Sequence, residues 1–326
     1  MFFNTMMFGT LTSISAYSWF SMWLGLEINL LSVIPLFNSN KNCFPSESAL
    51  KYFLTQTMAS SIILLAIVSI MNTHEFFNLN FDIIMSSGLL TKLGAAPFHY
   101  WFPEISEGLN WNNNLIILTW QKIAPMILIF YTIEINDFFI FIILISSIIG
   151  SMMGLNQISL RKILTFSSIN HISWMLSSMI VSSSIWMAYF VFYFFITISF
   201  TTFFKNCNVF FIEQLNNVKF SNKFSQLMVF MIFLSLGGLP PFLGFLPKWL
   251  TILYLNTQNL YFLSLFLIIF TLITLFFYLR MSFFSLMHLY EISTMQYTEK
   301  SFFHWWMYYS PNIVGLLLSS LIFSFF

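Results

Sequence analysis

Apolar stretches long enough to cross a membrane follow one another almost without pause along this 326-residue chain. Hydrophobic residues make up 58% of the sequence, and charged residues make up only 7%. A soluble protein of this composition has too few polar side chains to cover its surface. Since a spanning helix needs about 20 apolar residues, the sequence predicts an all-α polytopic membrane protein.

A hydropathy window of about 19 residues divides the chain into about eleven transmembrane helices. Most of these spans are rich in Phe, Ile and Leu on all faces, which is typical of helices surrounded by lipid or by other helices. We expect residues 1–326 to form a single membrane domain. The predicted spans are 2–17, 19–37, 49–71, 82–102, 113–132, 137–155, 164–183, 185–205, 226–256, 260–285 and 308–326.

Charged residues in the loops and at the ends of the spans separate by sign when alternate loops are counted. An excess of Lys and Arg marks the cytoplasmic or matrix side of a membrane protein. The sequence therefore predicts an N-terminus on the matrix or cytoplasmic side and a C-terminus on the opposite side. One side carries Lys41, Lys51, Arg161, Lys162, Lys205, Lys219, Lys223 and Lys300, and the other carries Glu75, Asp82, Glu134 and Asp137.

Two spans are interrupted by Gly and Pro, and both contain the pattern G-x-x-P-F, at 94–98 and 238–242. Proline removes a backbone donor and clashes with the preceding turn, so each helix should break or bend there. A pair of broken helices in corresponding places points to an antiporter-like inverted repeat, with the site at the breaks. We expect repeat halves at about 1–135 and 136–285, followed by a C-terminal helix at 308–326.

Four charged residues lie deep inside the predicted spans: Glu27, Lys92, Lys122 and Lys248. An ionisable side chain at this depth is unfavourable by about 2.5–3.5 kcal/mol on insertion scales. Burial favours the neutral form of a lysine, whereas a nearby carboxylate favours the charged form. A Glu–Lys pair that separates and re-forms is therefore a protonation switch, and the four residues predict an ion or proton path.

Each of these residues also has a structural interpretation. Glu27 can be a neutral acid hydrogen-bonded to a neighbouring helix, and Lys92 can form a static ion pair with it. Lys122 can serve only to hold its helix in place. Lys248 can be an interfacial lysine beside an anchoring tryptophan, Trp249, if its span ends at the break.

Two histidines, His99 and His171, also lie within the predicted spans. A buried histidine is most often a hydrogen-bonded core residue. It can also carry protons, because imidazole titrates near neutral pH. Both interpretations stay open for these residues.

Several other functions are disfavoured by what the chain contains. It has two cysteines, Cys43 and Cys207, whereas an iron–sulfur cluster needs about four thiolates. We find no Gly-rich phosphate loop, zinc-ligand spacing or nucleophile elbow. The net charge of +1 argues against a nucleic-acid partner.

Eight short stretches, in order along most of the chain, closely resemble the NADH dehydrogenase subunit 2 family of mitochondrial respiratory complex I. Members of this family are antiporter-like, proton-pumping membrane subunits. The animal proteins resemble bacterial counterparts that have lost their first three helices, which leaves eleven. The matching stretches are 25–29, 51–56, 92–99, 119–125, 154–157, 160–162, 167–171 and 236–241 continuing to 247–249.

The resemblance implies a role for each buried charge. Glu27 and Lys92 match the family's Glu–Lys pair, Lys122 matches its central lysine, and Lys248 matches the lysine of the second broken helix. The implied location is the mitochondrial inner membrane, with the N-terminus in the matrix and the C-terminus in the intermembrane space. The implied partners are the other membrane-arm subunits of complex I and membrane lipids.

We therefore expect a core membrane subunit of proton-translocating NADH:ubiquinone oxidoreductase. We expect no cofactor in this chain, because NAD, FMN, iron–sulfur clusters and ubiquinone would be bound by other subunits. The main alternative is a stand-alone cation/proton antiporter, which would exchange ions without NADH. A third interpretation is a mainly structural subunit, whose buried charges only fix the packing of its helices.

Overall fold

The computed structural model describes residues 1–37, 43–72, 81–133, 136–215, 218–219, 223–240, 242–286 and 295–296. These residues are helical apart from turns and one pair of two-residue strands, so the predicted all-α class is confirmed. The chain divides into two compact units, Met1–Ile142 and Ile143–Phe326. The C-terminal helix predicted at 308–326 lies outside the described residues.

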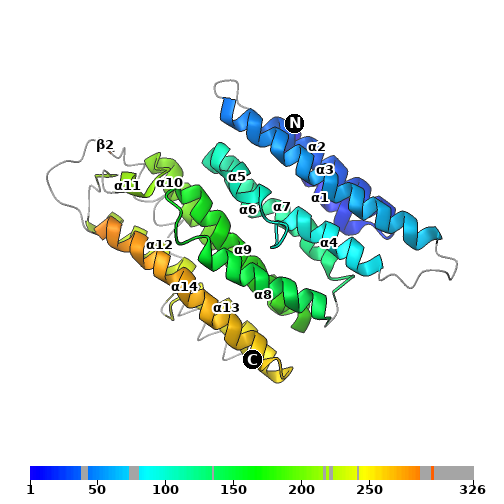
Figure 1. The fold of residues 1–326 in the computed structure, drawn as a ribbon. Helices are drawn as coiled ribbons and strands as arrows, with labels where there is room; N and C mark the ends of the chain where they lie inside the picture. The colour runs from blue at the N-terminus through cyan, green and yellow to red at the C-terminus, as the bar shows by residue number, and fades with distance from the viewer. Residues whose placement is uncertain are drawn as a thin grey trace. The chain divides into compact units, whose positions relative to one another are not determined.

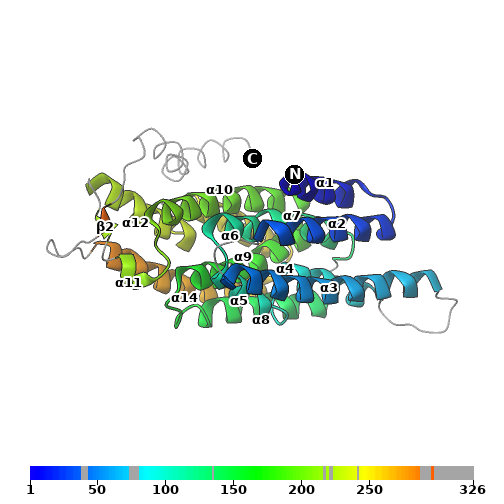
Figure 2. The same cartoon turned by 90° about the horizontal axis from the view of Figure 1, so that it is seen from above.

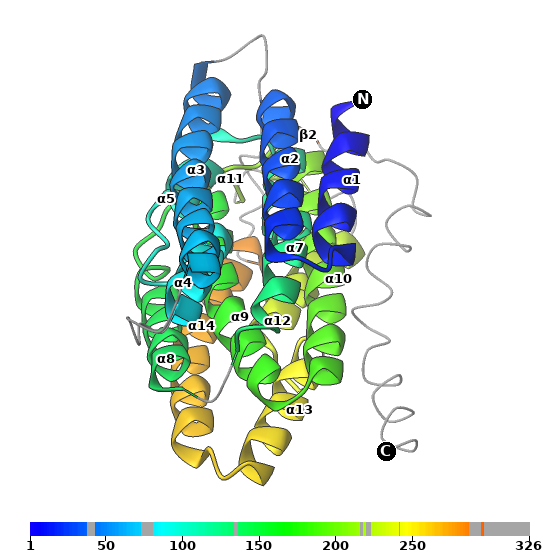
Figure 3. The same ribbon diagram turned by 90° about the vertical axis from the view of Figure 1, so that its right-hand side faces the viewer.

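The first unit is a bundle in which α2 packs against both α1 and α3, and α4 packs against α3 and α7 (Figure 1). Figure 3 shows α1, α2 and α3 as neighbouring rods. The helices are α1 (Phe2–Ser15), α2 (Trp19–Phe37), α3 (Cys43–Asn72), α4 (Phe81–Leu93), α5 (Trp101–Gly108), α6 (Trp111–Leu118) and α7 (Trp120–Ile129).

Small residues allow α1 and α2 to lie against each other backbone to backbone (Figure 2). A Cβ atom on Gly9 would come within 2.7 Å of the backbone nitrogen of Asn29. A Cβ atom on Gly25 would come within 2.5 Å of the backbone nitrogen of Ser13. Close approach through small residues is the usual way in which helices associate in lipid. Here the close approach places α1 against the backbone of Asn29 on α2.

The second unit packs α9 against α10 and α13, and places α14 along α12 (Figure 1). Helix α8 (Asp137–Met152) contains the boundary between the units. The other elements are α9 (Leu160–Val181), α10 (Ser183–Cys207), α11 (Ile212–Leu215), α12 (Lys223–Gly237), α13 (Phe245–Thr257), α14 (Tyr261–Leu286) and the paired strands β1 (Val218–Lys219) and β2 (Met295–Gln296).

Helices α4 and α12 end at the two predicted interruptions, and they end in the same way. Gly94 and Gly238 follow the last helical residues with φ angles of +74° and +76°. After each glycine, the next backbone N–H bonds to a carbonyl five residues earlier, from Ala95 to Leu90 and from Leu239 to Leu234. This is a Schellman-type end, which glycine favours because it has no Cβ atom. The interruptions are thus helix ends rather than bends.

A third interruption was not predicted. The span expected at 113–132 is divided at Thr119, with α6 before it and α7 after it. The φ and ψ angles of Thr119 are −119° and −70°. Pro125 lies inside α7 and cannot donate to the carbonyl of Gln121, so this short helix lacks a further backbone bond.

Four helices of the described part of the chain are long and apolar enough to cross a membrane. They are Trp19–Phe37, Cys43–Met71, Ser183–Cys207 and Tyr261–Phe283, and Asp137–Met152 is a shorter apolar helix. The predicted spans at 82–102, 113–132 and 226–256 are each divided between two helices. The number of crossings therefore does not follow from helix length alone.

Candidate functional site

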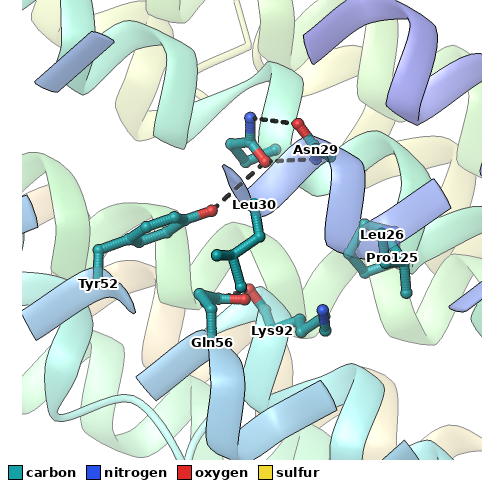
Figure 4. Close-up of a pocket in the computed structure, with 8 residues that line it drawn as sticks. Leu26, Asn29, Leu30, Tyr52, Gln56, Lys92 and Pro125 are labelled. Carbon is teal, nitrogen blue, oxygen red and sulfur yellow. Dashed lines mark hydrogen bonds between the residues drawn. The ribbon is translucent and has the colours of Figure 1, made fainter. Parts of the chain in front are cut away.

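Lys92 lies in the last turn of α4 and faces a small cavity inside the first unit. Its side chain is only 7% exposed. Figure 4 shows the cavity-lining side chains converging from α2, α3, α4 and α7. Its space is close to that of a single water molecule. The lining residues are Leu26, Asn29, Leu30, Tyr52, Gln56, Lys92, Gln121 and Pro125.

Glu27 lies beside this cavity, on α2, and is half-buried. Its Oε1 atom is buried and has no hydrogen-bond partner. The carboxylate interacts electrostatically with Lys92, yet no salt bridge joins the two side chains. By contrast, Lys51 forms salt bridges with Glu47 and Glu104 on the surface. Glu27 and Lys92 therefore do not form a salt bridge in this structure.

Uncharged polar side chains connect the helices around the cavity. The Asn29 amide nitrogen donates to Gln121 Oε1 at 2.7 Å, and the Gln121 amide nitrogen donates to Asn29 Oδ1 at 3.2 Å. The Tyr52 hydroxyl donates to the same Gln121 oxygen at 3.5 Å (Figure 4). Gln56 donates to the Lys92 backbone carbonyl at 3.5 Å.

We did not predict these four residues as parts of a site. Asn and Gln side chains inside apolar helices could nevertheless have indicated contacts between helices, since amides in membrane spans form hydrogen bonds between helices. The sequence cannot show which amide meets which.

Lys122 lies next to Gln121 on α7 but does not line the cavity. Its side chain is 2% exposed. Its ammonium nitrogen lies 5.5 Å from the centre of the Phe102 ring on α5. An ammonium over an aromatic face is a favourable cation–π contact. The structure thus places Lys92 and Lys122 in the same unit but in different surroundings.

His99 lies in the turn between α4 and α5 and is also buried. Its Nδ1 atom is 3.3 Å from the Pro97 carbonyl, and its ring stacks on Tyr100 at 4.6 Å. These contacts are local. They are compatible with either a core residue or a proton carrier.

Lys248 lies in the first turn of α13, in the second unit. Its ammonium donates to the Gly237 carbonyl at 3.0 Å. Gly237 is the last residue of α12, and the carbonyls at a helix end have no partner within the helix. A cation at this end also interacts favourably with the helix dipole. Lys248 is buried, so its hydrogen bond links the start of α13 to the end of α12 in the protein interior.

His171 lies on α9 and contacts α10. Its Nδ1 atom and the Tyr189 hydroxyl are 2.9 Å apart, and its ring centre is 5.1 Å from that of Tyr193. All three side chains are buried. Lys248 and His171 thus belong to the second unit, whereas Glu27, Lys92, Lys122 and His99 belong to the first. A continuous row of proton carriers through both sets stays a prediction.

Within the described ranges, no group of three or more His, Cys, Asp or Glu side chains is arranged to hold a metal ion. Cys43 and Cys207 are both free thiols. The polar groups of the candidate residues are amines, amides, hydroxyls, imidazoles and one carboxylate. These groups can exchange protons and orient water.

Comparison with known sequences gives a consistent set of relatives. The family described as "NADH:quinone oxidoreductase/Mrp antiporter, TM" matches residues 16–274. NADH-ubiquinone oxidoreductase chain 2 of Anopheles gambiae is 48% identical, and the match covers 99% of this chain and 93% of the mosquito protein. The protein of the same name from Aedes aegypti is also 48% identical, with 98% and 92% covered.

Solved structures share the fold. A chain of respiratory complex I from Thermus thermophilus gives a TM-score of 0.84 at 19% identity, covering 98% of this chain and 77% of that chain. A chain of the Mrp complex from Dietzia sp. gives a TM-score of 0.74 at 14% identity, covering 86% and 59%.

Proposed function

Because the chain belongs to the NADH:quinone oxidoreductase/Mrp antiporter transmembrane family, we propose that it is a core membrane subunit of NADH:ubiquinone oxidoreductase that carries protons across the membrane. Its apolar helices and its animal relatives make it a multi-pass mitochondrial membrane protein. The supporting observation in the site is that Lys92 and Lys122 are both buried within one unit. Burying two amines is unfavourable, and it is typical of a proton path.

The redox chemistry takes place in other subunits, which bind NAD, FMN, iron–sulfur clusters and ubiquinone. This chain contributes proton movement and contacts the other membrane-arm subunits and lipid. Its N-terminus faces the matrix and its C-terminus faces the intermembrane space. The charge segregation along the sequence supports this orientation.

The proposed cycle begins with a movement of Glu27 relative to Lys92. The two groups interact without a salt bridge, so a small displacement of α2 changes how strongly the carboxylate stabilises the ammonium. When the carboxylate withdraws, the Lys92 proton becomes easier to release. The proton then passes toward Lys122 and finally toward Lys248, with His99 and His171 as further candidate carriers.

Replacement of Lys122 by methionine tests the proposal most directly. Met has a similar length and no titratable group, so Lys122→Met should leave the complex assembled and lower the number of protons pumped per NADH. The ratio would be measured with the purified complex in liposomes. Lys51→Met is the matched control, because Lys51 is exposed and pairs with surface carboxylates. Unchanged pumping by an assembled Lys122→Met complex contradicts the proposal.

A stand-alone cation/proton antiporter is the second candidate, because the family description and the similar fold both include Mrp proteins. Separation of mitochondrial membranes into native assemblies decides between the two. A subunit of the oxidoreductase migrates in a large band that oxidises NADH. An antiporter migrates alone or with few partners and exchanges ions without NADH.

A mainly structural role is tested by the same lysine variants. If the buried charges only fix helix packing, neutral replacements at Lys92 or Lys122 reduce the amount of assembled complex. The complex that does assemble then pumps at the normal ratio.

A further inference from the structure

We propose that Asn29, Gln121 and Tyr52 form a hydrogen-bonded clamp that fixes the orientation of α7 and thereby positions Lys122 for proton exchange. The inference rests on the proposed function. The three side chains come from α2, α7 and α3, and they are 5%, 8% and 3% exposed. They act as positioning residues.

The clamp is closed because its polar groups satisfy one another. Asn29 and Gln121 exchange hydrogen bonds in both directions, and the Gln121 oxygen also accepts from Tyr52. A buried amide that loses its partner is left with unpaired donors and acceptors, which strongly favours keeping the pair together. The position of Asn29 is also fixed by α1, because Gly9 packs against the Asn29 backbone.

Helix α7 needs such support because its own backbone holds it weakly. Because the first four N–H and the last four C=O groups of a helix lack partners within it, a helix of ten residues forms few backbone hydrogen bonds. It starts directly after the interruption at Thr119, and Pro125 leaves the Gln121 carbonyl without a helical donor. The rotation of α7 about its axis therefore depends on side-chain contacts.

That rotation decides where Lys122 points. Gln121 and Pro125 are four residues apart, so they share one face of α7, and both line the cavity that Lys92 enters. Lys122 is the next residue after Gln121, about 100° further around the helix, and it lies over Phe102. Fixing Gln121 against α2 thus fixes Lys122 as well.

The clamp also joins two charged residues of the proposed path. Glu27 precedes Asn29 by two residues on α2, and Gln121 directly precedes Lys122 on α7. A displacement of α2 that changes the Glu27–Lys92 interaction is therefore passed through the amide pair to Lys122. Without the pair, α2 and α7 move independently. A movement of Glu27 relative to Lys92 then no longer changes the position of Lys122.

The test compares pumping by variants of the whole reconstituted complex. Asn29→Leu and Gln121→Met each remove one amide while keeping the size of the side chain. Asn29→Gln combined with Gln121→Asn exchanges the two amides and conserves their summed length. Asn113→Leu is the matched control, because Asn113 of α6 donates to the Leu36 carbonyl of α2 at 3.0 Å, away from the cavity.

We expect each single variant to pump fewer protons per NADH than the wild type. The decrease should be at least half of the decrease caused by Lys122→Met. We expect the exchanged double variant to recover at least half of that loss, and Asn113→Leu to match the wild type. Recovery by exchange is not expected of a residue that only fills space.

The clamp is overturned if Lys122→Met lowers the ratio while Asn29→Leu and Gln121→Met pump normally, or if the exchanged variant recovers nothing. If Lys122→Met itself has no effect, the proposed function fails instead. Should the single variants not assemble, the exchanged variant decides. Normal assembly and pumping by the exchanged double variant support the clamp. Failure of that variant to assemble overturns it.

Discussion

Three buried side chains of the candidate path, Lys248, Lys122 and His171, are stabilised by different kinds of contact. Lys248 donates to the carbonyl at the end of α12, and Lys122 lies over an aromatic ring. His171 pairs with Tyr189 between α9 and α10. A buried hydrogen bond of this kind contributes about 1 kcal/mol. Removing one such contact should therefore weaken the packing of two helices locally without unfolding the chain.

Replacement of Tyr189 by phenylalanine removes this hydroxyl and leaves the ring. We expect the α9–α10 contact to lose about 1 kcal/mol, which corresponds to roughly five-fold faster amide hydrogen exchange in these helices. Mass spectrometry of the purified complex measures the exchange. Tyr261→Phe is the control, since Tyr261 is exposed and its hydroxyl donates to Asn259 on the surface. Equal exchange in the two variants contradicts a stabilising role for the His171–Tyr189 bond.

Helix interruptions organise the charged residues of both units. Lys92 lies just before the end of α4, and Lys248 lies just after the interruption between α12 and α13. Helices α4 and α12 are each followed by a glycine at positive φ. At the second interruption, the glycine also lies directly against the lysine. A Cβ atom on Gly238 would come within 2.7 Å of Lys248 Nζ.

Alanine at Gly238 should therefore disturb the site in two ways. A left-handed backbone conformation is unfavourable for alanine by about 1–2 kcal/mol, and the new methyl group displaces the Lys248 ammonium from Gly237. We expect lower stability and fewer protons pumped per NADH. Gly237→Ala is the matched control, because its Cβ atom has 3.6 Å to the nearest atom, on Leu275. If both variants pump equally, the contact of Lys248 with the helix end has no role.

The sequence predicted the interruptions at Gly94 and Gly238 because glycine and proline act locally on the backbone. It did not predict the interruption at Thr119, because threonine is common within helices and the nearest proline is six residues later. The Asn29–Gln121 pair was also missed. Its members are 92 residues apart, and hydropathy does not reveal which faces of apolar helices meet. Buried charges were recognisable as unusual residues, but their partners depend on packing.

The chain as a whole consists of two compact units, Met1–Ile142 and Ile143–Phe326, and the repeat halves at about 1–135 and 136–285 stay a prediction. Compactness does not establish an inverted relation between the halves, which stays a prediction. Within the second unit, the start of α9 and the end of α10 lie together. A β-bridge joins Ser159 to Phe211, and Arg161 lies 4.7 Å from the Phe210 ring.

The proximity of the start of α9 to the end of α10 allows a direct test of the predicted membrane orientation. Arg161 and Lys162 at the start of α9, and Lys205 at the end of α10, lie at one end of the second unit. If basic residues mark the matrix side, this end faces the matrix. Asp137, at the start of α8, then faces the intermembrane space. Both Lys205 and Asp137 are exposed, so each is a suitable position for labelling.

We expect Lys205→Cys to react with an impermeant maleimide only in inverted inner-membrane vesicles, and Asp137→Cys to react only in mitoplasts. Cys43 and Cys207 would be replaced by serine, because both are free thiols. Three predicted spans separate the two labelled positions, so they must react from opposite sides. Labelling from the same side would mean that a span between 137 and 205 does not cross. Reversed labelling would place the basic end in the intermembrane space, against the predicted orientation.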